Sequence, residues 1–169
     1  MLKSSIMSYV KYLMIAVVVI GLVIVGAVFI FKKQPIIKAN ISNKISYVVY
    51  WPTSVNSVPQ KNTIKFDSSS GVLSYVVYVS GVDTVVTEQS TPSEFSNFPT
   101  YYSTLINHLN NYDTFNTSVG NVYLTQPNNT SGDTAVINHS GTLLFAHAQS
   151  SIDENNWRTF FNNLKVILN

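Results

Sequence analysis

An uncharged apolar run over residues 13–31 constrains the fold more than any other feature of this sequence. The run, LMIAVVVIGLVIVGAVFIF, is nineteen residues long and contains no proline and no hydrogen-bonding side chain. Because an α-helix rises about 1.5 Å per residue, a run of this length covers roughly the 30 Å hydrocarbon core of a bilayer. The sequence therefore predicts one membrane-spanning helix, preceded by a short cytoplasmic tail over residues 1–12.

A cleaved signal peptide is the alternative explanation of this run. Val25, Gly26 and Ala27 have the small side chains that are typical of a cleavage site. The run is longer than the apolar core of about 7–15 residues that signal peptides usually have, and this length favours a retained anchor. A retained anchor would make the chain a single-pass protein of the cell membrane.

The charges are distributed unevenly along the chain. Residues 1–44 contain six lysines and no carboxylate, whereas residues 45–169 carry four cations against eight carboxylates, a net charge of −4. The predicted domain has no basic stripe that would bind nucleic acid, so we expect the membrane and not a nucleic acid as a partner. The lysines that flank the apolar run can meet anionic lipid head groups. These lysines are Lys3, Lys11, Lys32, Lys33 and Lys38.

The lysine count and the composition of the domain disagree about orientation. More lysines follow the predicted span than precede it, and this count alone places the domain in the cytoplasm. Long domains translocate largely regardless of flanking charge, however, and charged residues make up only 11% of the chain. A surface rich in Asn, Ser and Thr behind an N-terminal anchor is typical of an exported domain. We therefore expect the C-terminal domain to lie outside the cytoplasm.

The period of the apolar residues changes after the predicted span. Residues 32–44 contain Pro35 and sustain no hydrophobic period, which predicts a short tether. From residue 45 apolar side chains recur at every second position, the spacing of β-strands, with tight turns at Ser80-Gly81 and Ser140-Gly141. The predicted strands cover residues 45–51, 63–67, 72–79, 82–88, 114–119, 122–125, 134–138 and 143–148.

Two stretches, Thr91-Pro92-Ser93-Glu94 and Ser151-Ile152-Asp153-Glu154, carry the capping-box signal of a helix start. The first predicted helix, which Pro99 can break, has an apolar stripe that should face the sheet. This stripe consists of Phe98, Tyr101, Tyr102, Leu105, Ile106, Leu109 and Tyr112. The stripe of the second helix consists of Trp157, Phe160, Phe161, Leu164 and Leu168. Residues 45–169 are thus predicted to form one α+β domain, an antiparallel sheet packed with two helices.

Few residues of this sequence are candidates for catalysis. His108, His139 and His147, with Asp133 and Ser140, are the candidates for a hydrolytic centre, and their spacing matches no catalytic motif. The seven glycines are scattered singly and form no phosphate-binding loop. The chain contains no cysteine, which excludes disulfides, thiolate catalysis and zinc–thiolate sites. We therefore expect no enzyme, and no residue is assigned a catalytic, cofactor-binding or metal-binding role.

Several short stretches are similar to those of a known family. They are Tyr50-Trp51-Pro52, Val86-Thr87-Glu88-Gln89, Pro92-Ser93-Glu94-Phe95, Val119-Gly120-Asn121-Val122, Ser140-Gly141-Thr142-Leu143 and the capped helix from Ser151. Over residues 45–168 the chain resembles a bacterial domain-of-unknown-function family of single-pass, extracytoplasmic membrane-anchored proteins, some of them linked to anti-sigma-factor proteins. The resemblance implies an anchored domain outside the membrane, and the family carries no catalytic motif.

Two functions agree with these observations. The first is an interaction or sensor domain that recognises a protein or another component of the cell envelope. The second is a lipid- or hydrophobe-binding domain that holds apolar cargo in a cavity between the sheet and its helices. The apolar stripes look sufficient to fill the core, and this favours the interaction domain.

Overall fold

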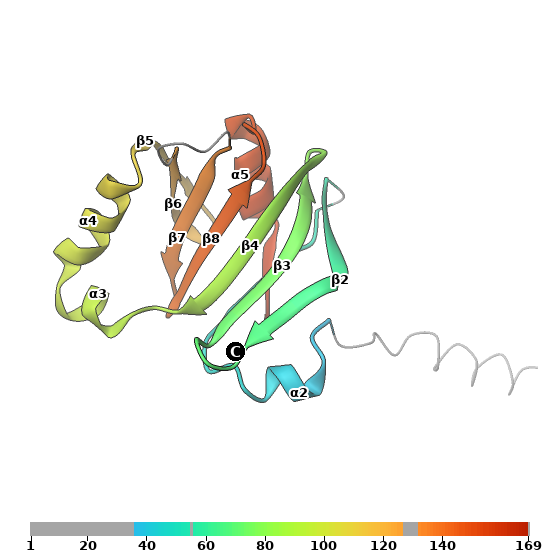
Figure 1. Cartoon of the computed structure of the whole chain (residues 1–169). Helices are drawn as coiled ribbons and strands as arrows, with labels where there is room; N and C mark the ends of the chain where they lie inside the picture. Colours follow the sequence, from blue (N-terminus) through green and yellow to red (C-terminus); the bar gives the residue numbers. More distant parts are fainter. Residues whose placement is uncertain (1–35, 55, 127–131, 169) are drawn as a thin grey trace, which may run out of the picture. The chain divides into compact units, whose positions relative to one another are not determined.

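The computed structural model describes residues 36–54, 56–126 and 132–168, so the span predicted for residues 13–31 lies outside the described part of the chain. In that described part, no helix has both the length and the apolar character needed to cross a membrane. The described residues form an α+β domain built on an antiparallel sheet, as the sequence predicts (Figure 1).

The main sheet contains seven strands in the spatial order β2-β3-β4-β8-β7-β6-β5. They are β2 (Ser57–Asp67), β3 (Val72–Val79), β4 (Val82–Ser90), β5 (Asn111–Thr117), β6 (Gly120–Thr125), β7 (Thr134–His139) and β8 (Thr142–Ala148). Two further strands, β1 (Val49–Pro52) and β9 (Leu164–Leu168), pair with each other in a separate antiparallel ribbon, which we call the β1–β9 ribbon.

Two tight turns fix the register of the central hairpins. Ser80 and Gly81 join β3 to β4 with φ angles of 51° and 87°, and Ser140 and Gly141 join β7 to β8 with 48° and 79°. Two-residue hairpin loops with positive φ at both positions match the twist of the strands that they join, and glycine adopts this conformation without a steric penalty. Both turns lie where the sequence predicts them.

The last helix, α5 (Glu154–Asn162), packs against one face of the main sheet, which we call the inner face. It begins at Asp153, whose side chain accepts a hydrogen bond from the Asn155 backbone N–H at 2.8 Å. Trp157, Phe160 and Phe161 are fully buried in the core that the inner face, α5 and the β1–β9 ribbon share. This confirms that the aromatic side chains of the predicted stripe face the core.

The opposite, outer face of the sheet is covered at one end by α3 (Ser93–Asn97) and α4 (Pro99–His108), which lie to the left in Figure 1. Phe98 separates these helices in an extended conformation with φ −135°, so the chain breaks at Pro99 as predicted. Ile106 of α4 packs against Val136 and Leu143 of the sheet. The covered part of the outer face is therefore the part formed by β6, β7 and β8.

The apolar stripe predicted for the first helix is only partly correct. Asn110 adopts a positive φ of 54° just after α4, and β5 begins at the next residue, so Tyr112 belongs to a strand and not to the helix. Phe98 and Tyr101 are 53% and 52% exposed, although the stripe was expected to face the sheet. Ile106 is the buried residue of α4.

The prediction of one helix to the end of the chain is wrong. The helix ends at Asn162, and Leu164 and Leu168 belong to β9. Leu164 fits both periods, since it continues the helical stripe and also begins a strand whose Val and Ile are β-branched and favour extended backbone. Pairing with β1, which lies far away in the sequence, decides in favour of the strand.

The packed domain also begins earlier than the sequence predicts. Ile37 is buried in the core, and a short helix, α2 (Ala39–Ser42), follows it. From Ile36 onward the structure therefore differs from the predicted tether over residues 32–44. The predicted strand over 45–51 is shorter, because β1 begins at Val49, and β2 is longer than predicted because it starts before Pro59. An edge strand can contain a proline since one side of its backbone has no ladder partner.

Candidate functional site

The main sheet leaves part of its outer face uncovered. Alternation along β3 buries Leu73 and Tyr75 on the inner face and directs Val76 and Tyr78 outward. Val76 is half-buried, and it is paired across the strands with Val85 of β4, which is 38% exposed. Four apolar side chains thus meet solvent on β2, β3 and β4, and we call them the outer-face patch. The outer-face patch consists of Val58, Val76, Tyr78 and Val85.

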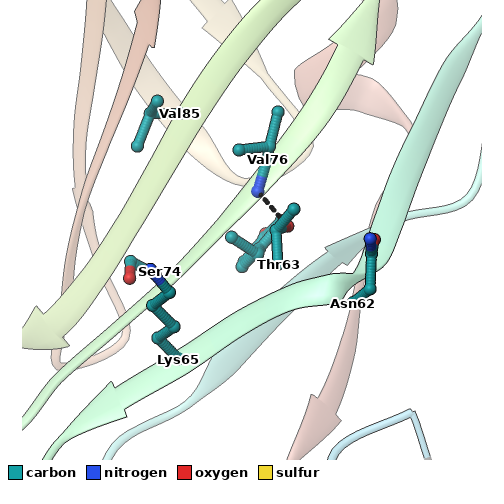
Figure 2. Close-up of a pocket in the computed structure, with 7 residues that line it drawn as sticks. Asn62, Thr63, Lys65, Ser74, Val76 and Val85 are labelled. Atoms are coloured by element: carbon teal, nitrogen blue, oxygen red, sulfur yellow. Dashed lines mark hydrogen bonds between the residues drawn. The ribbon is translucent and has the colours of Figure 1, made fainter.

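An open depression of about 360 Å³ adjoins this patch and shares Val76 and Val85 with it (Figure 2). Its lining residues are Asn62, Thr63, Lys65, Ser74, Tyr75, Val76 and Val85. The register of β2 against β3 shifts between Gln60 and Lys65, and the backbone of β2 leaves the ladder there. Bulges of this kind bend an edge strand away from its neighbour, and this opens the depression.

At the bulge, the Thr63 side chain takes the place of a backbone hydrogen-bond partner on β2. Its hydroxyl accepts a hydrogen bond from the Val76 N–H at 2.8 Å, which Figure 2 shows as a dashed line, and donates one to the Gln60 carbonyl at 2.6 Å. The floor of the depression, to which Val76 and Val85 belong, is apolar. Its rim offers neutral hydroxyl and amide groups and the ammonium of Lys65. Its lining residues include no histidine and no carboxylate.

A second notable group is a carboxyl buried on the inner face. Glu88 of β4 has no exposed surface, and its Oε2 accepts a hydrogen bond from the Tyr50 N–H at 2.9 Å. Its Oε1 lies 3.0 Å from the hydroxyl of Tyr75. Burial raises the pKa of Glu88 to about 8, although the hydrogen bonds from Tyr50 and Tyr75 act in the opposite direction.

The tyrosines around Glu88 also have raised pKa values. Burial raises the pKa of Tyr75 well above its ordinary value, and the neighbouring Glu88 adds to this effect. Burial likewise raises the pKa of Tyr47 to about 12. The Tyr47 hydroxyl accepts from the Leu73 N–H at 3.2 Å and lies 2.7 Å from the Glu88 backbone carbonyl. The segment that leads into β1 is therefore attached to the sheet by buried polar contacts.

The structure does not assemble the histidines into one site. His108 is the last residue of α4 and is exposed, and His139 is exposed at the end of β7. His139 pairs with Thr142, whereas His147 pairs with Thr134 at the other end of the same hairpin. In the described ranges, no three histidine or acidic side chains gather where they could hold a metal ion.

Asp133 and Ser140 do not complete a hydrolytic centre either. The Asp133 carboxylate accepts hydrogen bonds from the Ser151 hydroxyl at 3.0 Å and from the Ile152 N–H at 2.9 Å, so it fastens the segment that precedes α5. Ser140 occupies the turn between β7 and β8. Residues 127–131, between β6 and β7, lie outside the described residues.

Sequence reasoning missed both the outer-face patch and Glu88. The signal for Glu88 was present, because Thr84, Val86 and Glu88 alternate along one strand and the middle one is a valine of the core. The patch could not be recognised from alternation alone, since Val76 and Val85 look like core residues of a strand that is buried on both faces. In comparisons with known proteins, no family model, no curated protein and no solved structure matches this chain.

Proposed function

We propose that this chain is a single-pass protein of the cell membrane whose C-terminal domain lies outside the cytoplasm and binds a component of the cell envelope. The uncharged run over residues 13–31 and the neutral, Asn-, Ser- and Thr-rich composition of the domain support the location.

The outer-face patch is the observation that carries the binding function. Val58 is 54% exposed and Tyr78 is 42% exposed, on strands whose inner face is part of the core. Neighbouring exposed apolar side chains with a polar rim are typical of surfaces that bind a partner, since burying them releases water from apolar area. The patch and the open depression beside it are both on the uncovered part of the sheet.

The same geometry favours an interaction domain over a carrier of apolar cargo. A carrier would hold its ligand in an enclosed space between the sheet and a helix. The depression described above is instead open, and its apolar floor belongs to the outer face of β3 and β4 beyond the part that α4 covers. A protein or envelope component with an apolar contact surface is the partner that this arrangement suits.

Site-specific photo-crosslinking in cells that produce the full chain tests the proposal. A photoreactive phenylalanine analogue replaces Tyr78 in one variant and Asn155, which is exposed on α5, in a matched control. We expect a discrete crosslinked protein or envelope polymer from position 78 and none from position 155. Equal crosslinking from both positions would contradict binding at the outer-face patch, and crosslinks to lipid alone would support the hydrophobe-binding function instead.

A further inference from the structure

The β1 strand is attached to the main sheet in an unusual way. Its described ladder partner is β9, so β1 is not a strand of the seven-stranded sheet. Its polar attachment to the sheet comes from side chains: the Glu88 carboxyl accepts from the Tyr50 N–H, and the Tyr75 hydroxyl lies 3.0 Å from the Tyr50 carbonyl. Trp51 adds an apolar contact, since the centroid of its ring lies 4.7 Å from the centroid of the Tyr75 ring. Toward the main sheet, the side chains of Glu88 and Tyr75 therefore provide the hydrogen-bond partners of the Tyr50 backbone that a neighbouring strand would otherwise provide.

The polar groups at this attachment are satisfied best when Glu88 carries a proton. The Tyr75 hydroxyl has one proton, yet it lies 3.0 Å from both the Tyr50 carbonyl and Oε1 of Glu88. If Tyr75 donates to Tyr50, a protonated Glu88 can donate to the Tyr75 oxygen, and every group has a partner. If Glu88 is ionised, two acceptors compete for one proton, and one of them stays unsatisfied in the core, which costs free energy. The neutral carboxyl thus closes a ring of three hydrogen bonds.

Within the described residues, the groups that face Glu88 include no cation to balance a negative charge. The titratable groups that face it are Tyr75 from β3, Tyr50 from β1 and Tyr47 from the segment before β1, all of them neutral hydroxyls. On β8, its cross-strand partner is Leu144.

The cations of the neighbouring elements are directed elsewhere. Arg158 of α5 pairs with Glu154 and covers the ring of Phe115, and Lys165 of β9 is exposed. Among the described residues, a carboxylate at Glu88 would therefore be buried without a counter-ion, and separation of β1 from the sheet would allow water to reach it.

We propose that Glu88 is a proton-dependent latch: protonated, it fastens the β1–β9 ribbon to the main sheet, and loss of the proton releases the ribbon locally. The raised pKa of about 8 supports this direction, because an ordinary glutamate has a value of 4.5. Between these two values the open state binds fewer protons than the closed state. The opening equilibrium constant should therefore rise by up to about tenfold per pH unit and level off above about pH 8.

Hydrogen exchange of the full chain, followed by mass spectrometry between about pH 5 and pH 8, tests the latch. After correction for intrinsic exchange rates, we expect the opening constant of segments 49–52 and 164–168 to rise with pH. It should stay larger than that of the β7–β8 hairpin at each pH. If the ribbon and the hairpin always share one opening constant, the dependence belongs to global unfolding and the latch is refuted.

Two substitutions distinguish the contribution of Glu88 to the pH dependence from that of other carboxyl groups. Glu88→Gln is an uncharged copy of the protonated acid, so its ribbon should stay closed and the pH dependence should disappear. Glu94→Gln, which removes an exposed carboxyl of α3, should retain the wild-type dependence. A wild-type dependence that survives in Glu88→Gln would overturn the proposal. Should that variant fail to fold, ¹³C NMR of the wild-type Glu88 carboxyl decides, because an ionised signal at pH 6 excludes a protonated latch.

Discussion

The aromatic side chains of α5 are the residues on which the core depends most directly. Phe161 contacts Phe160 and Trp157, with ring centroids 5.0 Å and 6.0 Å away, and all three side chains are fully buried. Edge-to-face and tilted ring contacts of this kind add to the free energy gained by burying apolar area. A smaller side chain at position 161 would leave a cavity that its rigid aromatic neighbours cannot fill.

Phe161→Ala should lower the free energy of unfolding of the full chain by about 3–5 kcal/mol, because it removes a buried ring and leaves a cavity. Chemical denaturation followed by tryptophan fluorescence measures this change. Asn155→Ala, on the exposed side of the same helix, is the control and should change it by less than about 0.5 kcal/mol. Equal stability of the two variants would mean that position 161 is not in the core.

At the scale of the element, the sequence predicts those parts whose physical cause is local. Ser80-Gly81 and Ser140-Gly141 supply the positive φ angles that a two-residue turn requires. Pro99 disfavours helical backbone at the preceding Phe98, and this separates α3 from α4. The β9 strand could not be predicted in this way, because five residues fit a helix or a strand equally well and the ladder with β1 decides between them.

The contacts of the candidate site escaped prediction for the same reason, although alternation along β4 indicates that Glu88 lies on the core face. Glu88 is placed beside Tyr50 by the packing of the β1–β9 ribbon on the sheet, and no local pattern reports that packing. The outer-face patch depends on where α4 ends its cover of the sheet. The sequence indicates that α4 has an apolar side, but Ile106 contacts Val136 and Leu143 and not the valines of β3 and β4.

Removal of β9 should destabilise the domain severely. A chain that ends at Asn163 lacks the ladder partner of β1 and the buried Leu164, and it uncovers apolar side chains of β1 such as Val49. Each large side chain lost from a core costs about 2–5 kcal/mol, and a whole domain has only about 5–15 kcal/mol of stability. We expect the truncated chain to lose its cooperative unfolding transition in urea.

Val166→Ser is the control for this truncation. It changes a side chain of β9 that is 53% exposed and keeps the strand, so it should unfold close to the wild-type urea concentration. A truncated chain that unfolds at the same concentration as Val166→Ser would show that the domain does not need the β1–β9 ribbon.

At the scale of the whole molecule, the proposed orientation is open to a direct test because the chain contains no cysteine. Single cysteines replace Ser4, in the tail before the predicted span, and Ser96, which is exposed in α3. In intact cells a membrane-impermeant maleimide should label position 96 and should label position 4 only after lysis. The reverse pattern would mean that the lysine count, and not the composition of the domain, decides the orientation.

The pairing of β1 with β9 has a consequence for the order of events during synthesis. Val49 is translated early and its ladder partner Leu168 late, so the ribbon cannot form until almost the entire domain has been made. Contacts between distant parts of a chain also form slowly, because a long loop must close first. The part of the core that β1 and β9 close therefore forms late in synthesis. This order agrees with the export that we propose, because a secretion channel accepts an incompletely folded chain.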